Sequence, residues 1–207
     1  MLLETWLYYT LAVLVLTASP GPSVLLCLTK SVTEGFGASI YTALGSLTAI
    51  LIIMSLSFTG LGVVIASSQW LFNLIKWFGT AYLLYLGYKA FTSKQHNYEI
   101  EHNQTQKQSR LSLFTSGFWV GASNPKALIF FIALFPQFIS PSDALLPQYG
   151  IFCLTFAILE LGWLMAYAYL GAKSSSWLLQ NGRAKFFNKI TGGVFVGAGV
   201  LLSTSRV

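Results

Sequence analysis

Residues 5–29 have the sequence TWLYYTLAVLVLTASPGPSVLLCLT, which contains no charged side chain. A helix that crosses the apolar core of a bilayer needs roughly 20 residues of this kind. The motif Ser19-Pro20-Gly21-Pro22 interrupts the stretch past its middle. Proline lacks a backbone N–H group and clashes with the preceding helical turn. The stretch therefore predicts a membrane-spanning helix that is broken at this motif.

Five more apolar segments follow, and they predict spans at residues 38–60, 70–91, 113–135, 149–171 and 187–204. Hydrophobic residues make up 55% of the 207-residue chain and charged residues only 9%. A soluble domain has roughly 25% charged residues, so this composition cannot cover a soluble surface. We expect an all-α integral membrane protein with six transmembrane helices, surrounded by the lipid bilayer.

Lysine and arginine collect at one set of span ends, namely Lys30, Lys89, Lys94, Lys107, Arg110, Lys173, Arg183, Lys185 and Lys189. Short loops rich in these residues face the cytoplasm. The polar segment 92–111 is therefore expected to be a cytoplasmic linker, and six spans then place both termini in the periplasm. Because the basic residues do not share a face with aromatic residues, no nucleic acid partner is expected.

The linker divides the chain into residues 1–91 and 112–207, with three predicted spans in each. Since three is odd, the two parts must have opposite orientations, as in the inverted repeats of secondary transporters. The first span of the second part also contains a proline, in Asn124-Pro125-Lys126. We expect residues 1–207 to form one transmembrane transporter domain of two inverted three-helix repeats, the first helix of each broken at proline.

A helical proline leaves the carbonyl four residues earlier without its usual donor. The carbonyls concerned are those of Leu16, Ala18 and Gly121. An unpaired peptide group costs several kcal/mol in hydrocarbon. The two breaks are therefore expected to meet near the midplane around a protein-lined or watery cavity.

Two charged side chains lie inside the predicted spans, Lys126 beside the second break and Glu160 near the centre of the fifth span. Ionised groups at this depth are costly and usually functional. Their depths allow an ion pair. The pair could either hold helices together or belong to a substrate or proton site.

The remaining motifs have simpler interpretations. The G-x-x-x-G spacings at Gly117 and Gly121 and at Gly193 and Gly197 favour close helix packing, or equally a homodimer face. Metal-ligand spacing is absent from the sequence, so neither a metal nor a cofactor is expected. H-E-x-x-H and G-x-S-x-G are also absent, and an enzyme is not expected.

Three motifs in order resemble a known family: Leu16-Thr17-Ala18-Ser19-Pro20-Gly21-Pro22-Ser23, then Gly79-Thr80-Ala81-Tyr82-Leu83-Leu84-Tyr85-Leu86-Gly87, then Asn124-Pro125-Lys126-Ala127 with Phe135-Pro136-Gln137-Phe138. The chain resembles the lysine exporter (LysE) superfamily, in its homoserine/threonine resistance (RhtB) branch. This resemblance implies a six-helix exporter of amino acids or close derivatives, driven by the proton motive force, in the bacterial inner membrane. The chain has Ser23 where many relatives have Asn, and Ala49-Ile50 where many have Gly-Asp.

The residues expected to bind substrate are Ser19, Pro20, Gly21, Pro22, Ser23, Asn124, Pro125, Lys126 and Glu160. In this hypothesis, N–H groups near Ser23 and Val24, aided by Lys126 and Asn124, bind the carboxylate of an amino acid. Its ammonium group meets Glu160 or the freed carbonyls, and Glu160 also carries the coupling proton. Two alternatives stay open: an ion or metal exporter or channel on the same scaffold, and a membrane assembly protein without transport activity.

Overall fold

The computed structural model describes residues 3–60, 69–92, 108–140, 142–179 and 183–204. All regular structure in these ranges is helical. The helices are α1 (Leu3–Ala18), α2 (Pro22–Glu34), α3 (Phe36–Phe58), α5 (Gln69–Thr92), α6 (Arg110–Ala122), α7 (Pro125–Ile129), the π-helical η1 (Phe130–Leu134), the 3-10 helix η2 (Phe135–Phe138), α8 (Leu145–Leu179) and α9 (Arg183–Thr204). The helical class predicted from composition is thus confirmed.

The first predicted break is present, because α1 ends at Ala18 and α2 begins at Pro22, with a bend of 48° between them. The second is present too, because α6 ends at Ala122 and α7 begins at Pro125. The π-helical segment after α7 was not predicted. Ser57 of α3 donates its hydroxyl hydrogen to the carbonyl of Phe131 in that segment. This contact supplies a donor where the regular α-helical pattern is lost.

Among the described residues, two helices are long and apolar enough to cross a membrane, namely α3 and residues 145–174 of α8. The bent pair of α1 and α2 makes a third candidate span. The second break divides residues 110–138 into pieces that are each too short. Helices α5 and α9 contain lysines and other polar residues within their length, which lowers their hydropathy.

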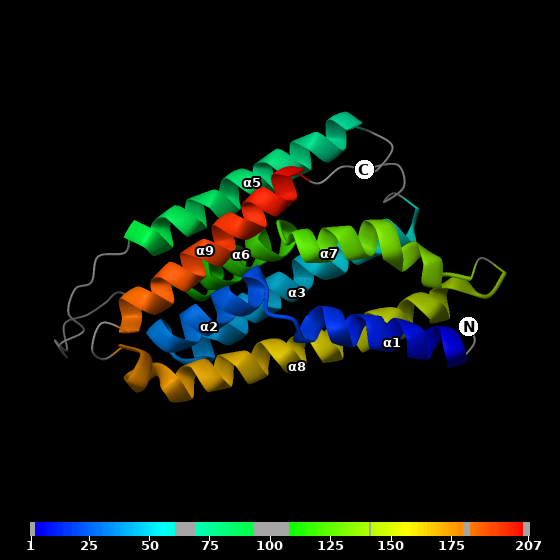
Figure 1. The fold of residues 1–207 in the computed structure, drawn as a ribbon. Helices are drawn as coiled ribbons and strands as arrows, with labels where there is room; N and C mark the ends of the chain where they lie inside the picture. The colour runs from blue at the N-terminus through cyan, green and yellow to red at the C-terminus, as the bar shows by residue number, and fades with distance from the viewer. Residues whose placement is uncertain (1–2, 61–68, 93–107, 141, 180–182, 205–207) are drawn as a thin grey trace.

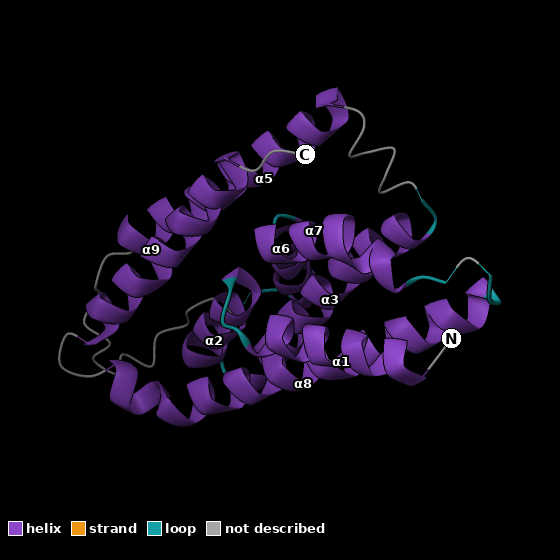
Figure 2. Ribbon diagram, turned by 45° about the vertical axis from the view of Figure 1, so that its right-hand side comes forward, coloured by secondary structure: helices purple, strands orange, loops and turns teal. Residues whose placement is uncertain are grey.

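The helices lie roughly along one direction and their ends gather at two ends of the molecule (Figure 1). The start of α1 and the end of α9 lie toward the end where α3 finishes and α5 begins. The end of α5 and the start of α6 lie at the opposite end. Figure 2 shows α5 and α9 together along one side, with α3, α6 and α7 between them and the pair of α1 and α8.

Glycine controls how closely α3 and α6 approach. A Cβ atom placed on Gly117 would lie 1.9 Å from the carbonyl oxygen of Thr42, and one on Gly45 would lie 2.0 Å from that of Phe114. The predicted close approach at Gly117 is therefore confirmed. At Gly193 and Gly197 the same spacing does not bring another described helix close, because nothing lies within 4 Å of a Cβ atom added to either residue.

Aromatic rings fill the core between α1, α3, η1 and α8. Phe131 and Phe135 are fully buried, with ring centroids 5.4 Å apart in an edge-on arrangement. Tyr9 of α1 packs against Phe152 of α8 at 4.5 Å and donates its hydroxyl hydrogen to the carbonyl of the same residue at 3.1 Å. This packing fixes α1 and the segment after α7 on α8, and so positions both breaks.

Candidate functional site

The carbonyls freed at the first break are bound by side chains from helices far along the chain. The ammonium group of Lys126 donates to the carbonyl oxygen of Leu16 at 2.5 Å and to that of Ser19 at 2.6 Å. The hydroxyl of Tyr167, on α8, donates to the carbonyl oxygen of Ala18 at 2.9 Å. Both carbonyls that the prolines of the first break were predicted to free, those of Leu16 and Ala18, therefore take side-chain donors, and so does the carbonyl of Ser19.

The second break is closed by Asn124, which caps α7. Its side-chain oxygen accepts a hydrogen bond from the backbone N–H of Lys126 at 3.1 Å. The backbone N–H of Asn124 itself donates to the carbonyl of Gly121 at 3.2 Å. The carbonyl freed at this break is thus satisfied locally, and the break needs no distant donor.

A buried chain of polar side chains joins the two breaks. The side-chain amide of Asn124 donates to the hydroxyl oxygen of Ser23 at 3.3 Å, and Ser46 of α3 donates to the same oxygen at 2.8 Å. All three residues are buried. Ser23 follows the first break and Asn124 lies in the second, so these bonds hold the two breaks at a fixed separation.

Residues from both breaks line one cavity of about 870 Å³. Its lining residues are Leu16, Pro20, Gly21, Pro22, Asn124, Pro125, Lys126, Ile129, Phe130, Gln137, Val194, Gly197 and Ala198. The segment after the second break and the last turns of α9 both run toward the end of the molecule where α3 finishes and α5 begins (Figure 1). The cavity therefore extends from the breaks toward that end.

Glu160 lies on α8 and is 8% exposed, outside the cavity lining. Its charge and that of Lys126 are close enough to interact. However, no hydrogen bond or ion pair joins these two residues, both of which the structure describes. The ion pair that their depths allow is therefore not formed between these two residues, because the carbonyls of Leu16 and Ser19 take the ammonium group of Lys126 instead.

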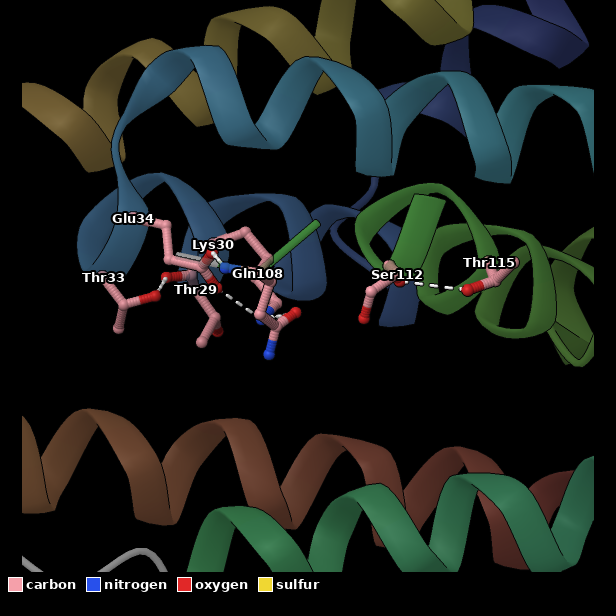
Figure 3. Close-up of polar contacts among 7 residues, drawn as sticks. All are labelled: Thr29, Lys30, Thr33, Glu34, Gln108, Ser112 and Thr115. Atoms are coloured by element: carbon pink, nitrogen blue, oxygen red, sulfur yellow. Dashed lines mark hydrogen bonds and ion pairs between the residues drawn. The ribbon is translucent and has the colours of Figure 1, made fainter. Parts of the chain in front are cut away.

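At the opposite end of the molecule, the end of α2 is tied to the residues just before α6 (Figure 3). Lys30 donates to Glu34 at 2.7 Å and to the side-chain oxygen of Gln108 at 2.9 Å. The backbone N–H of Gln108 donates to Glu34 at 3.3 Å. We call these three residues the polar clasp. It joins the end of α2 to the last residues of the linker, on the side away from the cavity.

Of the nine residues expected to bind substrate, six line the cavity: Pro20, Gly21, Pro22, Asn124, Pro125 and Lys126. Ser19 contributes its carbonyl and Ser23 lies behind the cavity in the polar chain. Tyr167 and Ser46 were not predicted from the sequence to belong to the site. Tyr167 follows Glu160 by seven residues, a spacing that places both residues on one face of α8 and could have predicted that Tyr167 faces the site. A serine in an apolar span, such as Ser46, has no spacing or charge that would predict this.

These features define the chain as a helical, multi-pass membrane protein with an internal polar site, and comparisons with known proteins identify its family. The family described as LysE type translocator matches residues 14–206. The chain belongs to this family, as the resemblance in its motifs predicted.

Several curated relatives cover nearly the whole chain. The homoserine/homoserine lactone efflux proteins of Salmonella typhimurium and Salmonella typhi are each 33% identical over 207 residues, which is 100% of this chain and 99% of theirs. An uncharacterized membrane protein of Vibrio cholerae is 28% identical over 205 residues, covering 99% of this chain and 98% of its own. No solved structure gives a significant match.

Proposed function

We propose that this protein exports small amino acids or their close derivatives across the bacterial inner membrane by proton-coupled antiport. The observation that carries this proposal is a cavity lined by residues of both proline breaks. In a membrane, irregular backbone of this kind survives only where protein or water satisfies its polar groups. Family membership supports translocation as the activity.

The proposed architecture has six spans in two inverted repeats, residues 1–91 and 112–207, joined by the cytoplasmic linker 92–111, with both termini periplasmic. The helix directions in Figure 1 agree with this arrangement, because α2, α5 and α8 end at one end of the molecule, whereas α1 begins at the other end and α9 runs toward it. Accessibility of a C-terminal tag from the periplasm tests the orientation. A homodimer also stays a prediction, which the mass of the purified protein in detergent tests.

The names of the relatives suggest which substrate group matters. Homoserine has an ammonium and a carboxylate group, whereas its lactone keeps the ammonium group and has no free carboxylate. A site that handles both compounds must recognise the group that they share. We therefore propose that the substrates of this chain are small molecules with a free α-ammonium group.

A substrate carboxylate, where one is present, would bind at the start of α2. The first turn of α2 has no side-chain cap, so its N–H groups are not taken by a neighbouring side chain. Helix N-termini favour anions for this reason. Lys126, which lines the same cavity, supplies a positive charge.

Glu160 is the proposed proton-coupling residue. It is a buried acid without a hydrogen bond among the described residues, near the charge of Lys126. Such a group can exchange a proton as its surroundings change, which would link proton entry to substrate exit. Ser19 to Ser23, Asn124 to Lys126 and Glu160 together are the residues that we propose bind substrate.

The experiment measures efflux of radiolabelled homoserine from loaded vesicles with and without a pH gradient. Glu160→Gln is expected to abolish the stimulation by the gradient. Glu4→Gln is the matched control, because Glu4 is exposed at the start of α1, and its efflux should equal that of the wild type. Undiminished gradient-driven efflux with Glu160→Gln would refute the coupling role. Ionic current without any dependence on an amino acid would refute the transporter itself in favour of a channel.

A further inference from the structure

We propose that the carbonyl oxygens of Leu16 and Ser19 form the binding site for the substrate's ammonium group, and that Lys126 fills this site when no substrate is bound. The proposal rests on the proposed function and specifies how its substrates are recognised. In the structure an ammonium group already occupies the site, at 2.5 and 2.6 Å from the two oxygens. A free primary amine presents the same –NH₃⁺ group with the same three donors.

The site can be reached from the cavity. Leu16 and Lys126 both line it, and the hydrogen bond from Lys126 to Ser19 lies at an exposed position. Gly21 forms the adjacent wall, where an added Cβ atom would lie 3.6 Å from the lysine nitrogen. A small ammonium compound in the cavity would therefore lie next to the two oxygens without any helix moving.

Exchange of one ammonium group for another changes neither the charge nor the number of hydrogen bonds at the break. This matters because removal of the lysine alone would leave two carbonyls unpaired and the charge of Glu160 without its nearby cation, and both changes are costly. Lysine is well suited to such exchange, because it is a compact charge on a flexible stem. The released ammonium group would stay in the cavity, where a substrate carboxylate could bind it.

The two roles of Lys126 predict different effects on different ligands. Toward an ammonium compound without a carboxylate, Lys126 acts only as a competitor. Toward a carboxylate without an ammonium group, it acts only as a partner. Homoserine lactone is the first kind of ligand, 2,4-dihydroxybutyrate is the second, and homoserine combines both.

The test measures the Kd of these three ligands by calorimetry for the purified full-length protein in detergent. Lys126→Met removes the charge and keeps most of the side-chain volume, and Lys126→Arg is the control that keeps a cation. We expect Lys126→Met to bind the lactone about tenfold or more tightly than the wild type, and to bind the dihydroxy acid less tightly. Lys126→Arg should show no such gain for the lactone. If Lys126→Met does not fold, Lys126→Gln takes its place with the same expectation.

Unchanged or weaker lactone binding by the neutral variant would overturn the proposal. So would equal wild-type affinity for homoserine and the dihydroxy acid, since the ammonium group would then contribute nothing. Efflux by the wild type, measured in the vesicles described under the proposed function, tests transport independently of the ammonium site. If homoserine is exported but the lactone does not bind more tightly to Lys126→Met, only the ammonium site is wrong.

Discussion

The packing of α3 against α6 predicts a large effect for a single methyl group at Gly117. An added Cβ atom would lie 1.9 Å from the carbonyl oxygen of Thr42 and 2.8 Å from its carbonyl carbon. These are backbone atoms, so rotation of a side chain cannot relieve the clash. The two helices must instead move apart, and the contacts along the whole interface weaken.

The expected cost follows from two opposing terms. Overpacking of a tight interface costs about 3 kcal/mol here, at the upper end of the usual range, because the atoms of Thr42 that the new methyl group meets belong to the backbone. Alanine regains about 1 kcal/mol over glycine through its higher helix propensity. Gly117→Ala should therefore lower the free energy of unfolding by about 2 kcal/mol, which for a chain of this length lowers Tm by about 4–8 °C.

The assay is thermal unfolding of the purified protein in one detergent, with Gly162→Ala as the matched control. Gly162 lies within α8 and is exposed, with nothing within 4 Å of an added Cβ atom. This variant keeps only the propensity gain, so its Tm should rise by about 2–4 °C. If Gly117→Ala melts at or above the temperature of Gly162→Ala, the close contact between α3 and α6 is refuted.

Two further predictions concern the hydrogen bonds at the break and at the polar clasp. Tyr167→Phe leaves the carbonyl of Ala18 without its donor, which should lower the free energy of unfolding by about 1–3 kcal/mol in the same assay. A Tm equal to that of the wild type would contradict this hydrogen bond. Glu34→Gln removes the ion pair with Lys30; the side chains of Lys30 and Glu34 are 15% and 17% exposed. The loss should lower the free energy of unfolding by no more than about 1 kcal/mol. A larger fall in Tm would show that the polar clasp contributes more than an ordinary ion pair near the surface.

The positions of the breaks could be predicted from the sequence because proline acts locally. The missing N–H group of Pro20 identifies Leu16 as the carbonyl left without a donor, whatever the rest of the chain does. The donor could not be predicted in this way. Lys126 lies 110 positions from Leu16, and only the packed helices bring the two together.

The sequence also suggested a partner for Lys126 that the structure does not give it. A buried acid and a buried base favour an ion pair when charge alone is considered. At the break, however, two unpaired carbonyls compete for the same ammonium group, and each accepts a short hydrogen bond from it. Charge alone therefore did not predict the partner of Lys126, because backbone carbonyls at the break also accept hydrogen bonds from its ammonium group.

The limits of the helices were predicted less well than the positions of the two breaks. Helix α8 extends over Leu145–Leu179, beyond the expected residues 149–171, because the residues on either side of the apolar stretch are also compatible with a helix. The π-helical turn at Phe130–Leu134 has no proline or glycine within it. Its partner, the hydroxyl of Ser57 on α3, is again a long-range contact that local patterns do not contain.

The donors at the two breaks come from opposite parts of the chain, and this has a consequence for folding. The carbonyls of the first break depend on Lys126 and Tyr167, which lie after the linker. The side-chain amide of Asn124, in the second break, finds its acceptor in Ser23, before the linker. Either part alone would hold unpaired polar groups inside the bilayer, at a cost of several kcal/mol each. The broken helices are therefore stable only after the two parts have packed together, and the cavity forms in the same step.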